Sequence, residues 1–186
     1  MRIVFSLVVL LAIGCSGSDG GGGMRVPVPD SGQVFPNLTL QGFRSAAATD
    51  AFEPISTWDF SDPAGQRYDL VHVMVICMWC PHCNNETVDV MKLSEWRASH
   101  RVGVMQVAIQ GYTGQPPSLA EMQSWVREYA VDFPVLVDGD AAELGQTYSV
   151  KSVPLNIMVN PRTMGVLAMD LGEVGDVETY ERGFLP

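Results

Sequence analysis

The residues with the most evident chemistry are three cysteines in the segment ICMWCPHCNNE. Cys77, Cys80 and Cys83 follow one another with two residues between each pair. A C-x-x-C pair can cycle between dithiol and disulfide, while three cysteines at this spacing can also begin an iron–sulfur site or supply part of a zinc site. The residues on either side favour the redox interpretation.

The C-x-x-C pair lies where a buried strand is followed by a helix. Residues 68–79 form a β-branched apolar run, and residues 81–100 place apolar side chains at helical spacing, with Pro81 suited to a first turn. Unpaired backbone amides and the positive end of the helix dipole then lie beside the first sulfur and favour its thiolate. We therefore expect Cys80 to be the exposed nucleophile and Cys83 the resolving thiol one turn further in.

Two side chains near the pair are suited to support this chemistry. His82 lies between the cysteines and can donate to, or stabilise by its charge, the Cys80 thiolate. Glu86 follows Cys83 by three residues on the same helical face, where it can exchange a proton with the buried thiol. A solvated helix acid would show the same spacing, so both interpretations of Glu86 stay open at this stage.

The remaining segments predict an α/β sandwich in the order βαβαβαββα. Ser118 and Glu121 have capping-box spacing, and Pro154 belongs at the start of its strand because proline cannot sit in a central one. A cis bond after Val153 would leave the preceding backbone free to pair with an extended substrate. Strands are expected at 34–43, 102–109 and 133–138 and in a hairpin at 154–160 and 166–172, helices at 118–131, 140–150 and 176–184, and a loop or irregular helix at 44–54.

These features resemble the thioredoxin superfamily. The segments MWCPHC, FPNLTL and FPVLVDGDAAELGQTYSVKSVPLNIMVNPRTMGVL are most similar to its membrane-tethered, extracytoplasmic thiol-disulfide oxidoreductases of the TlpA/ResA type. The resemblance implies a thioredoxin-like three-layer sandwich over residues 34–186, with a central mixed β-sheet and helices on both faces, and no cofactor. It also implies roles for Cys80 and Cys83 as the redox pair, Glu86 as the proton carrier, Pro154 in a cis-proline loop, Val153 as the substrate-facing backbone, and Trp79 at the rim of the site.

The chain departs from this family in three places. Met74 stands where cytoplasmic thioredoxins have a buried aspartate, which leaves Glu86 as the proton carrier, and Leu155 stands where the family usually has threonine. Pro81 and His82 resemble the disulfide-forming oxidases of the DsbA type more than the reductases. The direction of electron flow is therefore open.

Two other functions are alternatives to disulfide exchange. A peroxiredoxin-like thiol peroxidase needs Thr or Ser three residues before its reactive cysteine and a proline upstream, where this chain has Cys77 and Val73. A metal-binding, copper chaperone-like module would not need the complete redox set. An iron–sulfur run would need a fourth cysteine at Thr87, and three ligands at one strand-to-helix junction do not readily converge on zinc. We therefore expect no metal site, and we interpret Cys77 as a core residue and His72 as a core or edge histidine.

The N-terminus has the features of a bacterial lipoprotein. Residues 1–14 carry one arginine and a short apolar run that ends in AIGC, which resembles a lipobox with Cys15 as the lipidated residue. An ordinary signal peptide is the alternative. Residues 15–33 are rich in glycine, serine and proline and suit a flexible tether. Ser16, rather than aspartate after the lipidated cysteine, slightly favours the outer over the inner membrane.

Composition limits the partners. The net charge is −10 and no basic run is present, so we expect no nucleic-acid binding. With 47% hydrophobic residues, the chain can bury a full core without disulfides. The expected partners are thiols and disulfides of envelope proteins, a membrane redox partner of unknown identity, and the membrane itself through the N-terminal lipid.

Overall fold

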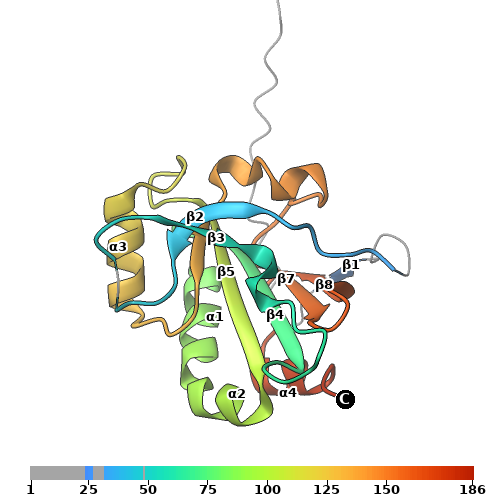
Figure 1. Ribbon diagram of the computed structural model, residues 1–186. Helices are drawn as coiled ribbons and strands as arrows, with labels where there is room; N and C mark the ends of the chain where they lie inside the picture. The colour runs from blue at the N-terminus through green and yellow to red at the C-terminus, as the bar shows by residue number, and fades with distance from the viewer. Residues whose placement is uncertain (1–23, 27–31, 48) are drawn as a thin grey trace, which may run out of the picture.

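The computed structural model describes residues 24–26, 32–47 and 49–186 (Figure 1). The predicted signal peptide, Cys15 and most of the predicted tether lie outside these residues. Eight strands form one mixed sheet in the order β1-β8-β7-β4-β5-β6-β2-β3. The strands are β1 (Met24–Val26), β2 (Thr39–Phe43), β3 (Glu53–Ser56), β4 (Leu70–Cys77), β5 (Val102–Gln110), β6 (Val135–Val137), β7 (Leu155–Asn160) and β8 (Gly165–Leu171).

The centre of the sheet is buried on both faces. All eight residues of β4 are buried, as are the first eight of β5, which matches the apolar runs that predicted them. β4 pairs in parallel with β5 and antiparallel with β7, and β6 continues the parallel part next to β5. Because β4 lies between two fully paired strands, the residue that follows it leaves the sheet at a fixed point.

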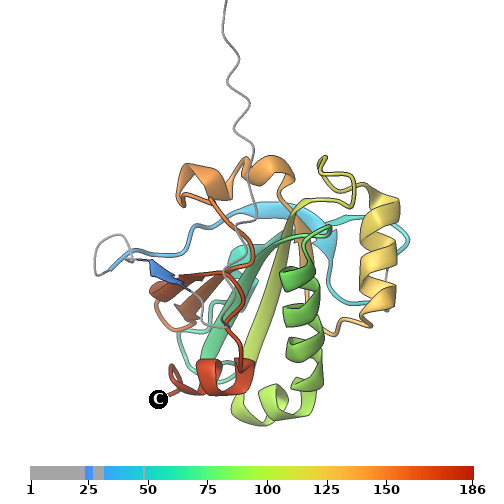
Figure 2. The ribbon, with the colours of Figure 1, turned by 180° about the vertical axis from the view of Figure 1, so that it is seen from behind.

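Helical segments lie on both faces of the sheet. Helices α1 (Pro81–Lys92) and α4 (Val177–Arg182) lie side by side on the face that Figure 2 presents, while the 3₁₀ turn η1 (Thr57–Phe60) lies in front of β4 in Figure 1. Helix α3 (Leu119–Glu128) begins with the predicted capping box, in which the side chains of Ser118 and Glu121 reach each other's backbone amides. The predicted α/β class with a thioredoxin-like mixed sheet is thus confirmed.

Three predictions of local structure were wrong. The single helix expected over 81–100 is broken at Leu93 into α1 and α2 (Ser94–His100). The helix expected over 140–150 is replaced by the 3₁₀ turns η2 (Gly139–Ala141) and η3 (Leu144–Gln146), because the Asp138 carboxylate accepts the amides of Glu143 and Leu144 and draws the chain out of a regular helix. The loop or irregular helix expected over 44–54 ends in strand β3, which begins at Glu53, and turn η1 follows this strand.

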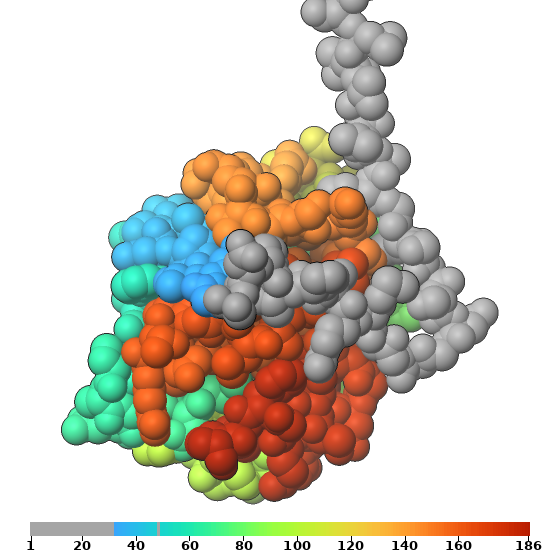
Figure 3. All heavy atoms as spheres, turned by 90° about the vertical axis from the view of Figure 1, so that its right-hand side faces the viewer, coloured from blue at the N-terminus to red at the C-terminus, as the bar shows by residue number. Residues whose placement is uncertain are grey.

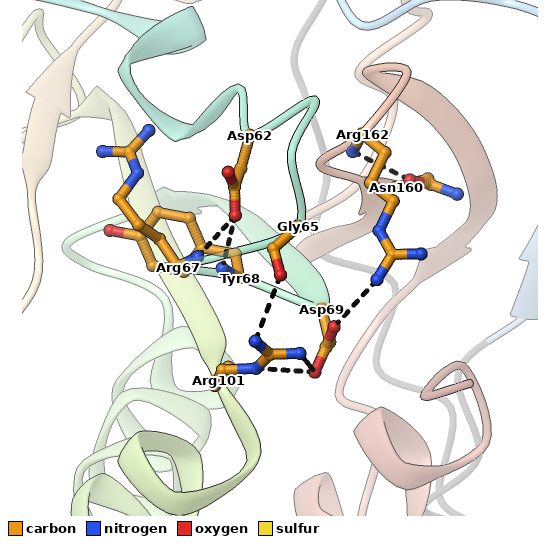
Figure 4. A network of polar contacts seen from close by, with 8 residues as sticks. All are labelled: Asp62, Gly65, Arg67, Tyr68, Asp69, Arg101, Asn160 and Arg162. Atoms are coloured by element: carbon orange, nitrogen blue, oxygen red, sulfur yellow. Dashed lines mark hydrogen bonds and ion pairs between the residues drawn. The ribbon is translucent and has the colours of Figure 1, made fainter.

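An ion-pair network fixes the end of the sheet opposite the cysteines (Figure 4). The carboxylate of Asp69, just before β4, accepts two hydrogen bonds from Arg101 at 2.8 and 2.5 Å and lies 3.5 Å from Arg162 in the β7–β8 turn. This joins the start of β4 to the end of α2 and to the hairpin.

Among the described residues no helix is long and apolar enough to cross a membrane.

Candidate active site

The two cysteines of the C-x-x-C pair lie at the junction of β4 and α1. Cys80 has extended backbone angles and is the residue before α1, Pro81 occupies the first turn, and Cys83 lies within that turn. Cys77, Cys80 and Cys83 are held as thiols. The placement of the pair at a strand-to-helix junction follows the sequence prediction, but the expected exposure of Cys80 was wrong, since both Cys80 and Cys83 are 0% exposed.

The cis-proline loop covers Cys80. The peptide bond between Val153 and Pro154 is cis, as the sequence suggested, and the Val153 carbonyl oxygen lies 3.7 Å from the Cys80 sulfur, which donates to it. The Pro154 carbonyl in turn accepts the Gly172 amide at 2.8 Å, so the end of β8 holds the loop in place. The loop and the pair therefore face each other, although they are about 70 residues apart in the sequence.

Glu86 lies one turn of α1 beyond Cys83 and is fully buried. Of the two interpretations, the solvated helix acid is therefore wrong. Neither carboxyl oxygen makes a hydrogen bond within the described part of the chain, although Asn156 and the Val174 amide lie close enough to favour the charged form partly. Burial raises the pKa of Glu86 to about 7, against the opposing effects of the His72 charge and of those two neighbours.

A carboxyl group with a pKa near neutrality can act as acid and as base. At pH 7 it is divided between both forms, which is the condition under which a proton carrier works best. Burial also raises the pKa of the Cys83 thiol well above its ordinary value, and the adjacent Cys80 sulfur adds to this. Cys83 therefore needs a base close by if it is to react as a thiolate at neutral pH.

His82 is the exposed member of the motif. Its Nδ1 lies 2.8 Å from a carboxylate oxygen of Glu173, in the turn after β8, with 46% and 26% of the two side chains exposed. The hydrogen bond to Glu173 raises the pKa of His82, and the charges of Glu173 and Cys80 act in the same direction. The imidazolium form suits the predicted role in tuning Cys80.

A second set of contacts surrounds Cys77. The indole nitrogen of Trp79 donates to the side-chain oxygen of Gln110 at 3.0 Å, and the Cys77 sulfur lies 3.6 Å from the same oxygen. Cys77 itself is 0% exposed, which confirms the prediction that it is a core residue. Within the described part of the chain, no three His, Cys, Asp or Glu side chains are grouped so that they could hold a metal ion.

The sequence analysis missed three residues that complete the site. Asn156 and Glu181 bind His72 beneath α1, and Glu173 binds His82. Of the two positions expected for His72, core or edge, the structure shows the core, and its partners are 84 and 109 residues away in sequence. One signal was available for Glu181, because it lies four residues after the buried Val177 and so shares a helical face with it.

Comparison with known proteins defines the class. The sequence profile of the Redoxin family matches residues 30–171, and the chain belongs to this family. The protein is accordingly an oxidoreductase built on a thioredoxin fold. No curated protein matches the sequence significantly.

Solved structures share this fold at low sequence identity. The thioredoxin domain of a thiol-disulfide oxidoreductase from Bacteroides vulgatus is 16% identical, with a TM-score of 0.62 over 84% of this chain and 99% of that one. AhpC from Enterococcus faecalis is 12% identical, with a TM-score of 0.60 over 82% and 89%. A DsbF homologue from Corynebacterium diphtheriae is 16% identical, with a TM-score of 0.55 over 87% and 96%. At these identities the likeness establishes the fold alone.

The burial of Glu86 predicts a pH-dependent stability. Because the folded pKa, about 7, lies above the ordinary value of 4.5, folding is favoured by this group below pH 4.5 and this contribution is lost as the pH rises through 7. Relative to the variant Glu86→Gln, the free energy of unfolding of the wild type should fall by about 3 kcal/mol across that interval. Urea denaturation of the reduced proteins at pH 5 and 8 measures it.

Glu95→Gln is the matched control for this experiment. Glu95 lies on the exposed face of α2 and should give the wild-type pH dependence. Equal pH dependence in the wild type and Glu86→Gln would show that Glu86 does not titrate with a raised pKa.

Proposed function

We propose that the protein exchanges disulfides with protein substrates through the Cys80–Cys83 pair. The observation that carries this proposal is the arrangement of the pair at the start of α1, with the cis-proline loop against Cys80 and the buried Glu86 one turn beyond Cys83. This supplies a nucleophile, a resolving thiol, a proton carrier and a backbone segment beside the reacting sulfur.

In the reductive direction, the cycle begins with attack by the Cys80 thiolate on a substrate disulfide. A Cys80–substrate bond forms and one substrate thiolate leaves. Glu86 then accepts the Cys83 proton, and the Cys83 thiolate attacks the Cys80 sulfur, so that the Cys80–Cys83 disulfide forms and the second substrate thiolate leaves. Two electrons have passed from the pair to the substrate, and the proton on Glu86 passes to a thiolate or to water.

The Val153 backbone is proposed to pair with the substrate. Its carbonyl lies against the Cys80 sulfur, where a substrate chain must pass to bring its own sulfur to Cys80. Because Cys80 is fully buried, the substrate has to displace part of its cover. Trp79, half-buried and anchored to Gln110, is proposed to form one wall of that opening.

Trapping of the mixed disulfide tests this mechanism. Mixing Cys83→Ser with a peptide that contains one disulfide should give a stable Cys80–peptide adduct, visible by mass spectrometry and lost on adding dithiothreitol. Cys80→Ser should give none, and Cys77→Ser should behave like the wild type, which resolves the adduct. Failure of Cys83→Ser to form any adduct would contradict the proposed mechanism.

The same proteins distinguish the peroxidase alternative. A thiol peroxidase would oxidise Cys80 with hydrogen peroxide far faster than with the peptide disulfide. Comparable or slower oxidation by peroxide is expected here, because Cys77 and Val73 replace the residues that the peroxidase needs. A large preference for peroxide would replace disulfide exchange by peroxide reduction as the function.

The reduction potential of the Cys80–Cys83 pair tests the role of His82. If the His82 imidazolium stabilises the Cys80 thiolate, and with it the reduced form, His82→Gln should make the potential more negative by tens of millivolts, roughly 30 mV for each 1.4 kcal/mol. Equilibration with glutathione buffers measures this, and His100→Gln serves as a distant control. An unchanged potential would remove His82 from the tuning of the pair.

The potential of the wild type also gives the direction of electron flow. A value near that of thioredoxin, about −270 mV, indicates a reductase supplied by a membrane electron donor. A value near about −120 mV indicates a protein that donates disulfides to its substrates.

We further propose that Cys15 is lipidated and tethers the domain at a bacterial envelope membrane. The AIGC sequence and the glycine-rich segment that follows it support this. In a bacterial host fed labelled palmitate, the wild type should carry the label and sediment with membranes, whereas Cys15→Ser should do neither. Cys77→Ser should keep the label. Labelling of Cys15→Ser equal to that of the wild type would rule out this anchor.

A further inference from the structure

A histidine with both ring nitrogens bound is buried beneath the redox pair. His72, in the middle of β4, is 0% exposed; its Nδ1 lies 2.8 Å from Glu181 on α4, and its Nε2 lies 2.8 Å from the side-chain oxygen of Asn156 on β7. The Asn156 amide nitrogen donates to the Gly172 carbonyl at 3.2 Å, which fixes the orientation of that side chain. Both ring nitrogens thus face hydrogen-bond acceptors.

This geometry favours a protonated ring beside the Glu181 carboxylate. A neutral imidazole has one N–H and could donate to only one of its two acceptors, whereas the imidazolium donates to both. Burial by itself lowers the pKa of His72, but the hydrogen bond and charge of Glu181, with smaller contributions from Glu86 and Asn156, outweigh it and raise the pKa. The two hydrogen bonds and the raised pKa together indicate an imidazolium in the middle of β4.

The charges around His72 do not balance if both nearby carboxyls ionise. Glu181 and Glu86 are each 0% exposed, and one oxygen of Glu181 and both of Glu86 make no hydrogen bond within the described residues. One buried cation thus serves two buried carboxyl groups. Since an uncompensated buried charge is costly, the cluster tends to keep one proton, and Glu86 is the carboxyl whose two oxygens make no hydrogen bond within the described residues.

We propose that His72 is a positioning residue for the exchange reaction, whose charge, shared between Glu181 and Glu86, holds the buried Glu86 carboxyl between its charged and neutral forms. The inference rests on the proposed function, because Glu86 is there the proton carrier for Cys83. Asn156 is the neighbour that His72 and Glu86 share, and it lies two residues after Pro154. His72 is thus hydrogen-bonded to the strand that follows the cis-proline loop.

The proton transfer then moves one negative charge from Glu86 to the Cys83 sulfur and leaves the number of buried charges unchanged. When Glu86 accepts the Cys83 proton it becomes neutral, and His72 and Glu181 remain as a balanced pair. When Glu86 gives the proton up, its negative charge is stabilised by His72. His72 neither gains nor loses a proton in the step, and the electrons move only between sulfur atoms.

Other titratable groups also face the cluster. On α1 these are His82 and Cys83, and Glu173 in the turn after β8 raises the pKa of Glu86. The Tyr180 ring on α4 lies 6.1 Å from His72, and its hydroxyl donates to Asp170 on β8 at 2.6 Å. In Figure 3 the C-terminal segment packs against the β7–β8 hairpin. The test must therefore separate His72 and Glu181 from these neighbours.

Two substitutions with opposite expected effects provide this test. His72→Gln removes the cation and leaves two carboxyls, so the pKa of Glu86 should rise by about one unit or more, a tenfold change in its ionisation. Glu181→Gln removes the carboxylate that competes for the His72 charge and leaves Glu86 as its sole counterion, so the pKa of Glu86 should fall. Carbon-13 NMR of the glutamate carboxyls in the reduced protein measures both shifts, with Glu86→Gln identifying the signal.

The kinetic readout follows the same signs. The acid limb of the rate at which Cys83 resolves a Cys80–peptide disulfide should move to higher pH in His72→Gln and to lower pH in Glu181→Gln. Glu178→Gln, whose side chain is 40% exposed on α4 and pairs with Arg182, should leave both the NMR titration and the rate profile unchanged. If His72 and Glu181 had only a structural role, the two variants would not shift the acid limb in opposite directions.

The outcomes separate this inference from the proposed function. Shifts of the Glu86 titration in the same direction in both variants, or in neither, overturn the inference whatever the thiol chemistry does. Opposite shifts in the titration without matching shifts in the resolving rate also overturn it. If Cys83→Ser fails to trap a peptide, the proposed function falls instead, and the titration still reports on the cluster. Glu181→Gln alone suffices if His72→Gln does not fold, since a raised pKa there contradicts the inference.

Discussion

The burial of β4 on both faces is the constraint on which the rest of the site depends. With β5 on one side and β7 on the other, this strand has no free edge, and its eight residues have no access to water. The chain therefore leaves the sheet at a fixed point and direction, and Cys80 and the first turn of α1 are placed there. β7, which carries the cis-proline segment at its start, is hydrogen-bonded to the same strand. One strand thus positions both halves of the site.

The same burial makes polar groups near β4 costly, and this cost explains their arrangement. A histidine in the middle of such a strand needs partners from the neighbouring elements, which Glu181 and Asn156 provide. Glu86 is less well compensated, since neither of its carboxyl oxygens is hydrogen-bonded within the described part of the chain. The incomplete compensation of Glu86 destabilises its charged form, and a carboxyl that titrates near neutrality is the consequence. Stability is given up at the point where proton transfer is proposed to occur.

The sequence was informative wherever a local pattern reflected a local cause. The apolar runs predicted β4 and β5 because strands buried on both faces have no polar side to display, and Ser118 with Glu121 predicted the start of α3. It was misleading over 140–150, where the helical pattern is overridden by the Asp138 carboxylate, which binds two backbone amides. The break at Leu93 has no comparable signal, since neither glycine nor proline marks it.

Within the site, the limit of prediction was the distance along the chain. Cys80, Cys83 and Glu86 share one helix, so their spacing predicts that they lie on one face, and Pro154 is marked by the rule that excludes proline from central strands. The burial of Cys80 was not predictable, because it depends on the Val153 carbonyl from a distant segment. For the same reason Glu173, Glu181 and Asn156 were missed. Each acts on a motif residue through tertiary contacts that no local pattern encodes.

A carboxyl with a pKa near neutrality also bears on the choice between oxidase and reductase. In either direction the Cys83 sulfur must exchange one proton, and a group that is half ionised gives and takes it with similar ease. Glu86 therefore does not favour a direction. His82, bound by Glu173 at the exposed side of the motif, is proposed to act on Cys80 rather than on the Cys83 proton, and a positive charge there would favour the reduced pair. Proton exchange and redox potential are thus proposed for separate residues, the buried Glu86 and the exposed His82, so that the potential can change without disabling the resolving step.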